Sequence, residues 1–287
     1  MKKLVFILSI ISIFFLTGCF KKDTLENINI YTSAYPIEYI TTKLYGEHST
    51  IKSIYPDGTN INHYELNQKQ LHDYSQSDMY IFNGLSKEQS YLISMVEKNK
   101  RLMIIDSTQS MEITSNLNEL WLDPSNVLMM ASNIKKGLLE YIQNVYLTTE
   151  IQNNYDELKV SISKLDASLK LLSENNNNPT IIVDNSALKF LEKYGFTVIC
   201  LEESDALTQK TISDATNLIE DNKITYIFTL DKENLNKTVK EVEHSTKAKI
   251  AEFKDLSNLT NKERSEKEDY ISLMTYNINL LKNEIYD

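Results

Sequence analysis

Residues 151–172 read IQNNYDELKVSISKLDASLKLL, a pattern in the middle of the chain on which the whole organisation depends. Its apolar residues recur at alternating spacings of three and four, at Ile151, Tyr155, Leu158, Ile162, Leu165, Leu169 and Leu172. This spacing predicts one apolar face on a helix about 30 Å long. A coiled coil or a helix bundle also shows such a face. The flanking sequence favours a helix that joins two lobes.

Both flanks alternate short apolar runs with helical patterns. Strands are expected at 27–33, 50–55, 79–82 and 102–105, and again at 180–183, 197–201, 224–229 and 248–253. Helices are expected at 37–45, 67–75, 88–98 and 124–146, and again at 187–194, 207–221, 235–244 and 269–286. This alternation is typical of parallel βα units. It predicts an α/β fold of two βα lobes with mainly parallel sheets, joined by a long rigid helix.

The expected organisation has four parts. They are a signal peptide (1–18), an N-terminal α/β lobe (19–147), a linking helix (148–176) and a C-terminal α/β lobe (177–287). Ligands of open α/β sheets bind beyond the carboxyl ends of the strands. Two such lobes facing one another therefore predict a ligand cleft between them.

The first nineteen residues predict where the protein resides. Lys2 and Lys3 precede an apolar run that is shorter than the roughly 20 residues of a membrane-spanning helix, as in a secretory signal. The residues that follow, Leu-Thr-Gly-Cys at 16–19, resemble a bacterial lipobox, which implies that Cys19 is lipidated and becomes the first mature residue. The predicted location is extracytoplasmic, lipid-anchored to the bacterial cell membrane. Plain secretion with an incidental cysteine is the alternative.

Composition excludes several classes of protein. The chain has 287 residues, 41% of them hydrophobic and 24% charged, which is an ordinary globular balance. With Lys2 and Lys3 removed, 28 basic against 40 acidic residues leave a charge of 28 − 40 = −12, so no nucleic-acid partner is expected. The six glycines form neither a G-x-G-x-x-G nor a P-loop motif. With Cys19 acylated, Cys200 has no partner and is expected to be a buried, inert thiol.

Six short segments, in order along the chain, carry a resemblance. They are YPDGTNINHYEL (55–66), NGL (83–85), WLDP (121–124), SALKFLEKYG (186–195), FKDL (253–256) and DYISLMTYN (269–277). Together with the lipobox they resemble the zinc/manganese-type metal-ion solute-binding lipoproteins of bacterial ABC importers. The resemblance covers nearly the whole mature chain, although no single segment is specific.

This resemblance implies one metal ion in the cleft between the lobes, held by four side chains. Carried over position by position, they are His63, Glu119, Asn185 and Asp255, where Glu119 and Asn185 stand in place of more usual ligands. It also implies that the ion, Mn²⁺ or Zn²⁺, is a transported ligand that passes to a cognate ABC permease. The protein is expected to be a monomer and not an enzyme.

The expected donors are one imidazole nitrogen and several oxygens, and such oxygen-rich sites suit Mn²⁺ better than Zn²⁺. Asn185 has the alternative role of a helix N-cap. The adjacent Asp184 replaces it only if the strand end turns that carboxylate toward the cleft, since neighbouring side chains of a strand point to opposite faces.

Two other functions are alternatives to metal capture. One keeps the fold without the metal, as a receptor for another solute or as a surface adhesin, and the replacement of two usual ligands motivates it. The other is a surface metallohydrolase. No G-x-S-x-G, H-E-x-x-H or Cys/His pair supports an enzyme of that kind.

Overall fold

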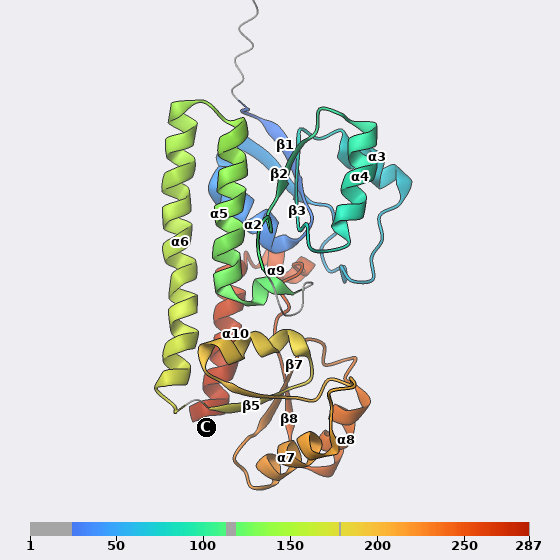
Figure 1. Ribbon diagram of the computed structural model, residues 1–287, viewed down its shortest axis with the longest axis vertical. Helices are drawn as coiled ribbons and strands as arrows, with labels where there is room; N and C mark the ends of the chain where they lie inside the picture. The colour runs from blue at the N-terminus through green and yellow to red at the C-terminus, as the bar shows by residue number, and fades with distance from the viewer. Residues whose placement is uncertain (1–24, 113–118, 178, 287) are drawn as a thin grey trace, which may run out of the picture.

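The computed structural model describes residues 25–112, 119–177 and 179–286. Two α/β lobes follow one another along the long axis, and one long helix runs beside both of them (Figure 1). The fold class expected from the sequence is thereby confirmed. The expected signal peptide (1–18) and Cys19 lie outside the described residues. Within the described residues, no helix combines the length and the apolar character needed to cross a bilayer.

The N-terminal lobe is a parallel sheet in the order β2-β1-β3-β4. Its strands are β1 (Ile28–Thr32), β2 (Ser49–Ser53), β3 (Met79–Phe82) and β4 (Met103–Asp106). Its helices are α2 (Tyr35–Tyr45), η1 (Gly46–His48), α3 (Gln68–Ser75) and α4 (Glu88–Lys98). Strand β3 is buried along its whole length, as a parallel sheet covered on both faces requires.

The C-terminal lobe repeats the plan in the order β6-β5-β7-β8, again all parallel. Its strands are β5 (Thr180–Val183), β6 (Thr197–Cys200), β7 (Tyr226–Thr229) and β8 (Lys249–Glu252). Its helices are η3 (Ser186–Tyr194), α7 (Gln209–Glu220) and α8 (Lys237–Ser245). Element η3 is a 3₁₀ helix, and its buried Leu188, Leu191 and Tyr194 recur every three residues, which matches the 3₁₀ period.

The helices beside the lobes are α5 (Pro124–Tyr141) and α6 (Val145–Glu174), and α10 (Tyr270–Tyr286) closes the chain. With 30 residues, α6 is about 45 Å long. The stripe from Ile151 to Leu172 is buried except for the half-buried Tyr155. The expectation of one helix over 124–146 is wrong at its end. Helix α5 stops at Tyr141, and Asn144 caps the start of α6 by accepting hydrogen bonds from the next turn.

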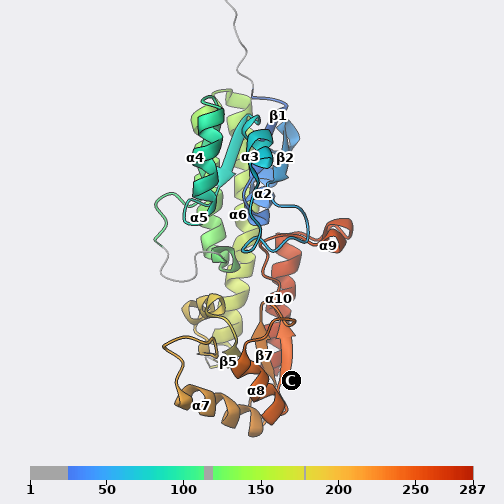
Figure 2. The same cartoon turned by 90° about the vertical axis from the view of Figure 1, so that its right-hand side faces the viewer.

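Short loops and helices lie at the junction of the two lobes, which Figure 2 shows from the side. The sequence patterns did not reveal two of them, η2 (Leu120–Leu122) and α9 (Asn261–Ser265). Backbone N–H groups of the N-terminal lobe donate to the segment after β8, from Tyr35 to Ser257 O at 3.0 Å and from Gly58 to Leu259 O at 2.7 Å. The main hydrophobic core likewise contains side chains of both lobes.

Candidate metal site

All four residues expected to bind metal lie in loops or at element ends near the junction of the lobes. His63 is exposed in the loop between β2 and α3. Glu119 directly precedes η2, Asn185 directly precedes η3, and Asp255 follows β8. This placement agrees with the rule that parallel sheets present their ligand groups beyond the carboxyl ends of strands.

Glu119 has one engaged and one free carboxylate oxygen. Its Oε1 accepts a hydrogen bond from Asn62 Nδ2 at 3.2 Å. Asn62 directly precedes His63, so this bond holds Glu119 close to the His63 loop. Its Oε2 is buried and has no hydrogen-bond partner among the described residues. Burial raises the pKa of this carboxyl, and the negative charges of Asp255 and Glu202 raise it further. A cation beside Glu119 would relieve both effects.

Asp255 is held against η2 by its own backbone. Its carbonyl oxygen accepts a hydrogen bond from Trp121 Nε1 at 2.8 Å. Its carboxylate accepts from Ser257 N at 3.0 Å and from Ser257 Oγ at 2.9 Å. Burial raises the pKa of Asp255, although the Ser257 hydrogen bonds oppose the change. Because Trp121 lies two residues after Glu119, the two acids are neighbours across the junction of the lobes.

The backbone of the residue before Asp255 is fixed by a side chain of α10. Asn277 is fully buried, and its Oδ1 accepts from Lys254 N at 2.8 Å while its Nδ2 donates to Lys254 O at 2.9 Å. Both backbone polar groups of Lys254, the residue before Asp255, are therefore satisfied by one side chain. This arrangement orients the Asp255 backbone without using its carboxylate.

Asn185 serves as a helix cap. Its Oδ1 accepts a hydrogen bond from Ala187 N at 2.8 Å at the start of η3. The neighbouring Asp184 has a different environment, because its Oδ2 accepts from Thr229 Oγ1 at 2.5 Å while its buried Oδ1 has no hydrogen-bond partner in the described part of the chain. Burial raises the pKa of Asp184 to about 6, and the charges of Glu202 and Asp231 contribute. Of the two neighbours, Asp184 has the open oxygen.

Glu202, which the sequence patterns did not single out, interacts electrostatically with acids of both lobes. It follows β6, and its charge raises the pKa of Glu119 on one side and of Asp184 on the other. Its position just beyond the end of β6 was the sequence feature that could have marked Glu202 as a candidate site residue. No three His, Cys, Asp or Glu side chains within the described residues converge closely enough to enclose a metal ion. The acids therefore influence one another electrostatically without forming a closed cage.

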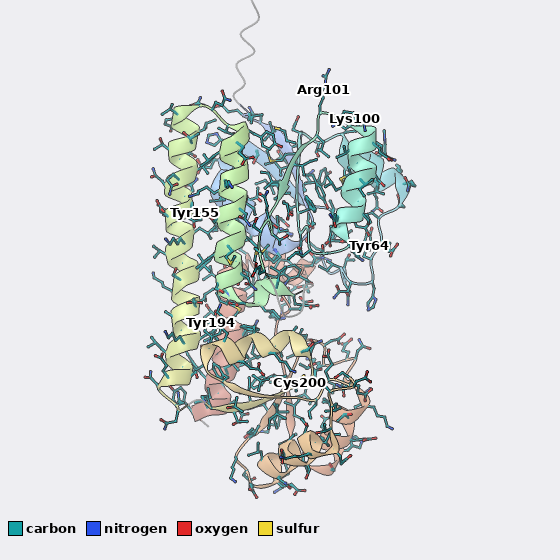
Figure 3. The ribbon with its side chains drawn as sticks, viewed as in Figure 1. Tyr64, Lys100, Arg101, Tyr155, Tyr194 and Cys200 are labelled. Carbon is teal, nitrogen blue, oxygen red and sulfur yellow. The ribbon has the colours of Figure 1, made fainter. Side chains whose placement is uncertain are left out.

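Each lobe has a cavity lined by residues at or near these acids. One of about 210 Å³ is lined by Asn62, Asn83, Glu88 and Trp121 among others. Another of about 240 Å³ is lined by Glu202 and Cys200 among others. Figure 3 shows Cys200 in the C-terminal lobe, and there it is half-buried rather than buried as expected. Burial raises the pKa of its thiol, which agrees with the expected low reactivity.

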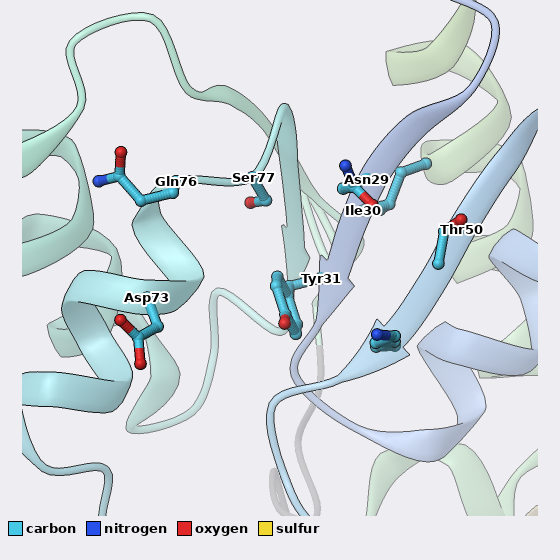
Figure 4. A pocket seen from close by; sticks show the side chains of 8 residues that line it. Asn29, Ile30, Tyr31, Thr50, Asp73, Gln76 and Ser77 are labelled. Atoms are coloured by element: carbon cyan, nitrogen blue, oxygen red, sulfur yellow. The ribbon is translucent and has the colours of Figure 1, made fainter.

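A further pocket is remote from these residues. It measures about 190 Å³ and lies between β1, β2 and the end of α3 (Figure 4). Its lining includes Asn29, Thr50, Asp73 and Gln76, and none of the expected metal residues. The acids at the junction of the lobes remain the better candidate for a cation.

Comparison with known proteins identifies the family. Residues 30–284 match the family model described as the periplasmic component A of the zinc-uptake complex. The iron-binding protein YfeA of Yersinia pestis is 23% identical over 280 residues, which cover 90% of this chain and 86% of YfeA. The zinc-binding lipoprotein AdcA of Streptococcus pneumoniae is 22% identical over 98% of this chain, which spans only 61% of AdcA.

A solved structure shows the same fold. It is the Zn(II)-bound ZnuA-like domain of Streptococcus pneumoniae AdcA, which matches with a TM-score of 0.74 over 91% of this chain and 100% of that domain. The sequence identity is 18%, so this likeness concerns the arrangement of the two lobes.

Proposed function

This chain belongs to the family of periplasmic zinc-uptake components, and we propose that it is an extracytoplasmic substrate-binding protein that captures one divalent metal ion for an ABC importer. The observation that carries the proposal is a set of electrostatically coupled acids near the junction of the lobes, two of which keep an oxygen unpartnered in the described part of the chain. Glu119 and Asp184 each keep a buried carboxylate oxygen without a partner among the described residues, and the charge of Glu202 raises the pKa of both. A divalent cation is the ligand that satisfies such groups.

The proposed ligands are His63, Glu119 and Asp255, with the fourth place taken by Asn185 or Asp184. Asp184 is favoured because the Asn185 oxygen already caps η3. One imidazole among carboxylates selects a harder ion than a nitrogen-rich site does, so Mn²⁺ is the favoured cargo and Zn²⁺ the second. Closure of the site requires the acids to approach one another, since the described groups do not yet enclose an ion.

The remaining elements of the proposal concern how the protein works in the cell. Cys19 carries the lipid anchor, and the ion passes from the monomeric protein to a cognate permease in the same membrane. This role requires no chemistry on the cargo. The site has only to bind, exclude protons and release.

The test is elemental analysis of residues 20–287 purified without chelator, then stripped and reloaded with Mn²⁺ or Zn²⁺. About one ion per chain is expected, and it is lost in His63→Ala and in Asp255→Asn. His72→Ala is the matched control, because His72 is an exposed histidine on α3. Unchanged metal content in both site variants refutes the ligand assignment.

The competing function has one specific observation in its favour, the use of Asn185 as a helix cap rather than as a free donor. A protein of the same fold that takes another solute, or acts as a surface adhesin, would bind no metal. It would also show no change in melting temperature on addition of Mn²⁺ or Zn²⁺.

A further inference from the structure

The end of the N-terminal lobe that is remote from the C-terminal lobe has an unusual surface. We call it the distal face and define it by residues 25–27, 98–101 and 143–146. Figures 1 and 2 show that the turn between α5 and α6 and the first described residues lie at this same end. Figure 3 shows Lys100 and Arg101 there as well, pointing away from the lobe.

The distal face exposes two adjacent large apolar side chains. Val145 and Tyr146 are 78% and 74% exposed in the first turn of α6, the highest values among the exposed large hydrophobic side chains of the described residues. A tyrosine with an apolar body and a polar hydroxyl suits the interface between lipid and water. Lys100 and Arg101 are exposed at the same end of the lobe, on its α4 side (Figure 3), and such cations attract lipid phosphates.

The start of the described chain is fastened to this face. The carbonyl oxygen of Leu25 accepts a hydrogen bond from Tyr45 Oη at 2.8 Å, and Asn27 N donates to His48 O at 2.7 Å. Cys19 is six residues before Leu25, a distance that a fully extended chain spans with at most about 20 Å. A lipid anchor at Cys19 therefore keeps the distal face within about 20 Å of the bilayer.

We propose that the distal face rests on the lipid surface in which Cys19 is anchored, with Val145 and Tyr146 in the interfacial layer and Lys100 and Arg101 beside lipid phosphates. This inference rests on the lipid anchor of the proposed function. The face also carries Glu26, and Glu140 is exposed next to it in the last turn of α5, so the apolar pair and the short tether drive the contact more than net charge does. The long axis of the molecule then points outward from the membrane, with the C-terminal lobe farther from the lipid than the N-terminal lobe.

The experiment uses the full lipidated chain in vesicles of phosphatidylcholine and phosphatidylglycerol. In a Cys200→Ser background, Val145→Cys carries a polarity-sensitive fluorophore, and the lipids carry a shallow quencher. Leu171→Cys is the matched control, because Leu171 is also an exposed apolar residue of α6, at 54% exposure. It lies 26 residues along the helix, about 39 Å away.

The expected result is a blue shift and quenching of the label at 145, with no change at 171. A second labelled variant, Tyr146→Cys, should behave as Val145→Cys does. Equal exposure to water at 145, 146 and 171 in protein that floats with the vesicles overturns the inference and leaves the anchor standing. Failure to float overturns both, whereas the metal content of the same sample reports separately on cargo binding.

Discussion

Replacing Asp184 with asparagine should stabilise the metal-free protein at neutral pH. The folded chain holds this carboxylate half-buried, with one oxygen bonded to Thr229 and the other without a hydrogen-bond partner in the described residues. Burial raises its pKa from 3.8 to about 6. At about 1.36 kcal/mol per pKa unit, a shift of this size corresponds to about 3 kcal/mol against the ionised form.

The sign follows from proton linkage. A carboxyl whose pKa is raised on folding binds its proton more tightly in the folded state than in the unfolded state. The free energy of unfolding therefore falls as pH rises from 3.8 to about 6, and the full cost applies above that window. Asparagine has no charge to desolvate and retains an oxygen that accepts from Thr229. The expected gain for Asp184→Asn is about 1 to 3 kcal/mol at pH 7.5, vanishing near pH 4.

The measurement is urea unfolding of chelator-treated protein at both pH values, followed by the fluorescence of the single tryptophan, Trp121. Asp205→Asn is the control, because Asp205 is an exposed acid in the loop after β6. If Asp184 is a metal donor, the same variant should bind Mn²⁺ more weakly although it is more stable. A variant no more stable than the parent at pH 7.5, or equally stabilised at both pH values, refutes the reasoning.

Two further predictions concern contacts that hold the lobes together and orient the site. Arg264→Met removes paired hydrogen bonds to Glu38 at 3.0 and 3.2 Å and to Asp57 at 2.6 and 2.8 Å. This variant should lower the free energy of unfolding, measured by the same urea titration, by about 1 to 3 kcal/mol. Arg264→Lys should give an intermediate value. Asn277→Ala leaves both backbone groups of Lys254 unsatisfied and should cost about 2 to 3 kcal/mol. It should also weaken Mn²⁺ binding in a calorimetric titration, and unchanged affinity would show that the Lys254 contact is structural alone.

The fold was readable from the sequence because each lobe is built from local patterns. The expected strand at 180–183 is β5 to the residue, and 79–82 is β3. The break between α5 and α6 was missed because apolar residues continue through it, at Leu138, Ile142 and Leu147. Only the Asn144 side chain marks the new helix start, and a single asparagine within a periodic pattern is a weak signal.

The candidate site was less readable, since side-chain direction depends on contacts between distant segments. The sequence places Asp184 and Asn185 side by side at a strand end. Their different roles arise from Thr229 on β7 and from the start of η3, which the chain brings together only in the folded lobe. The interaction of Glu202 with Glu119 is an electrostatic one between the two lobes, and no local pattern in either segment contains it.

The duplicated topology accounts for where these acids gather. In each sheet the chain order reverses beside the first strand, between β1 and β3 and between β5 and β7. Such reversals leave a crevice at the carboxyl ends of the strands, where the flanking helices do not cover the side chains. Asp184 follows β5 and accepts a hydrogen bond from Thr229, the last residue of β7, so it lies where the strand order of the C-terminal lobe reverses. Carboxylates that share a partly buried crevice cost stability without a cation, and this cost is the free energy that a bound divalent ion recovers.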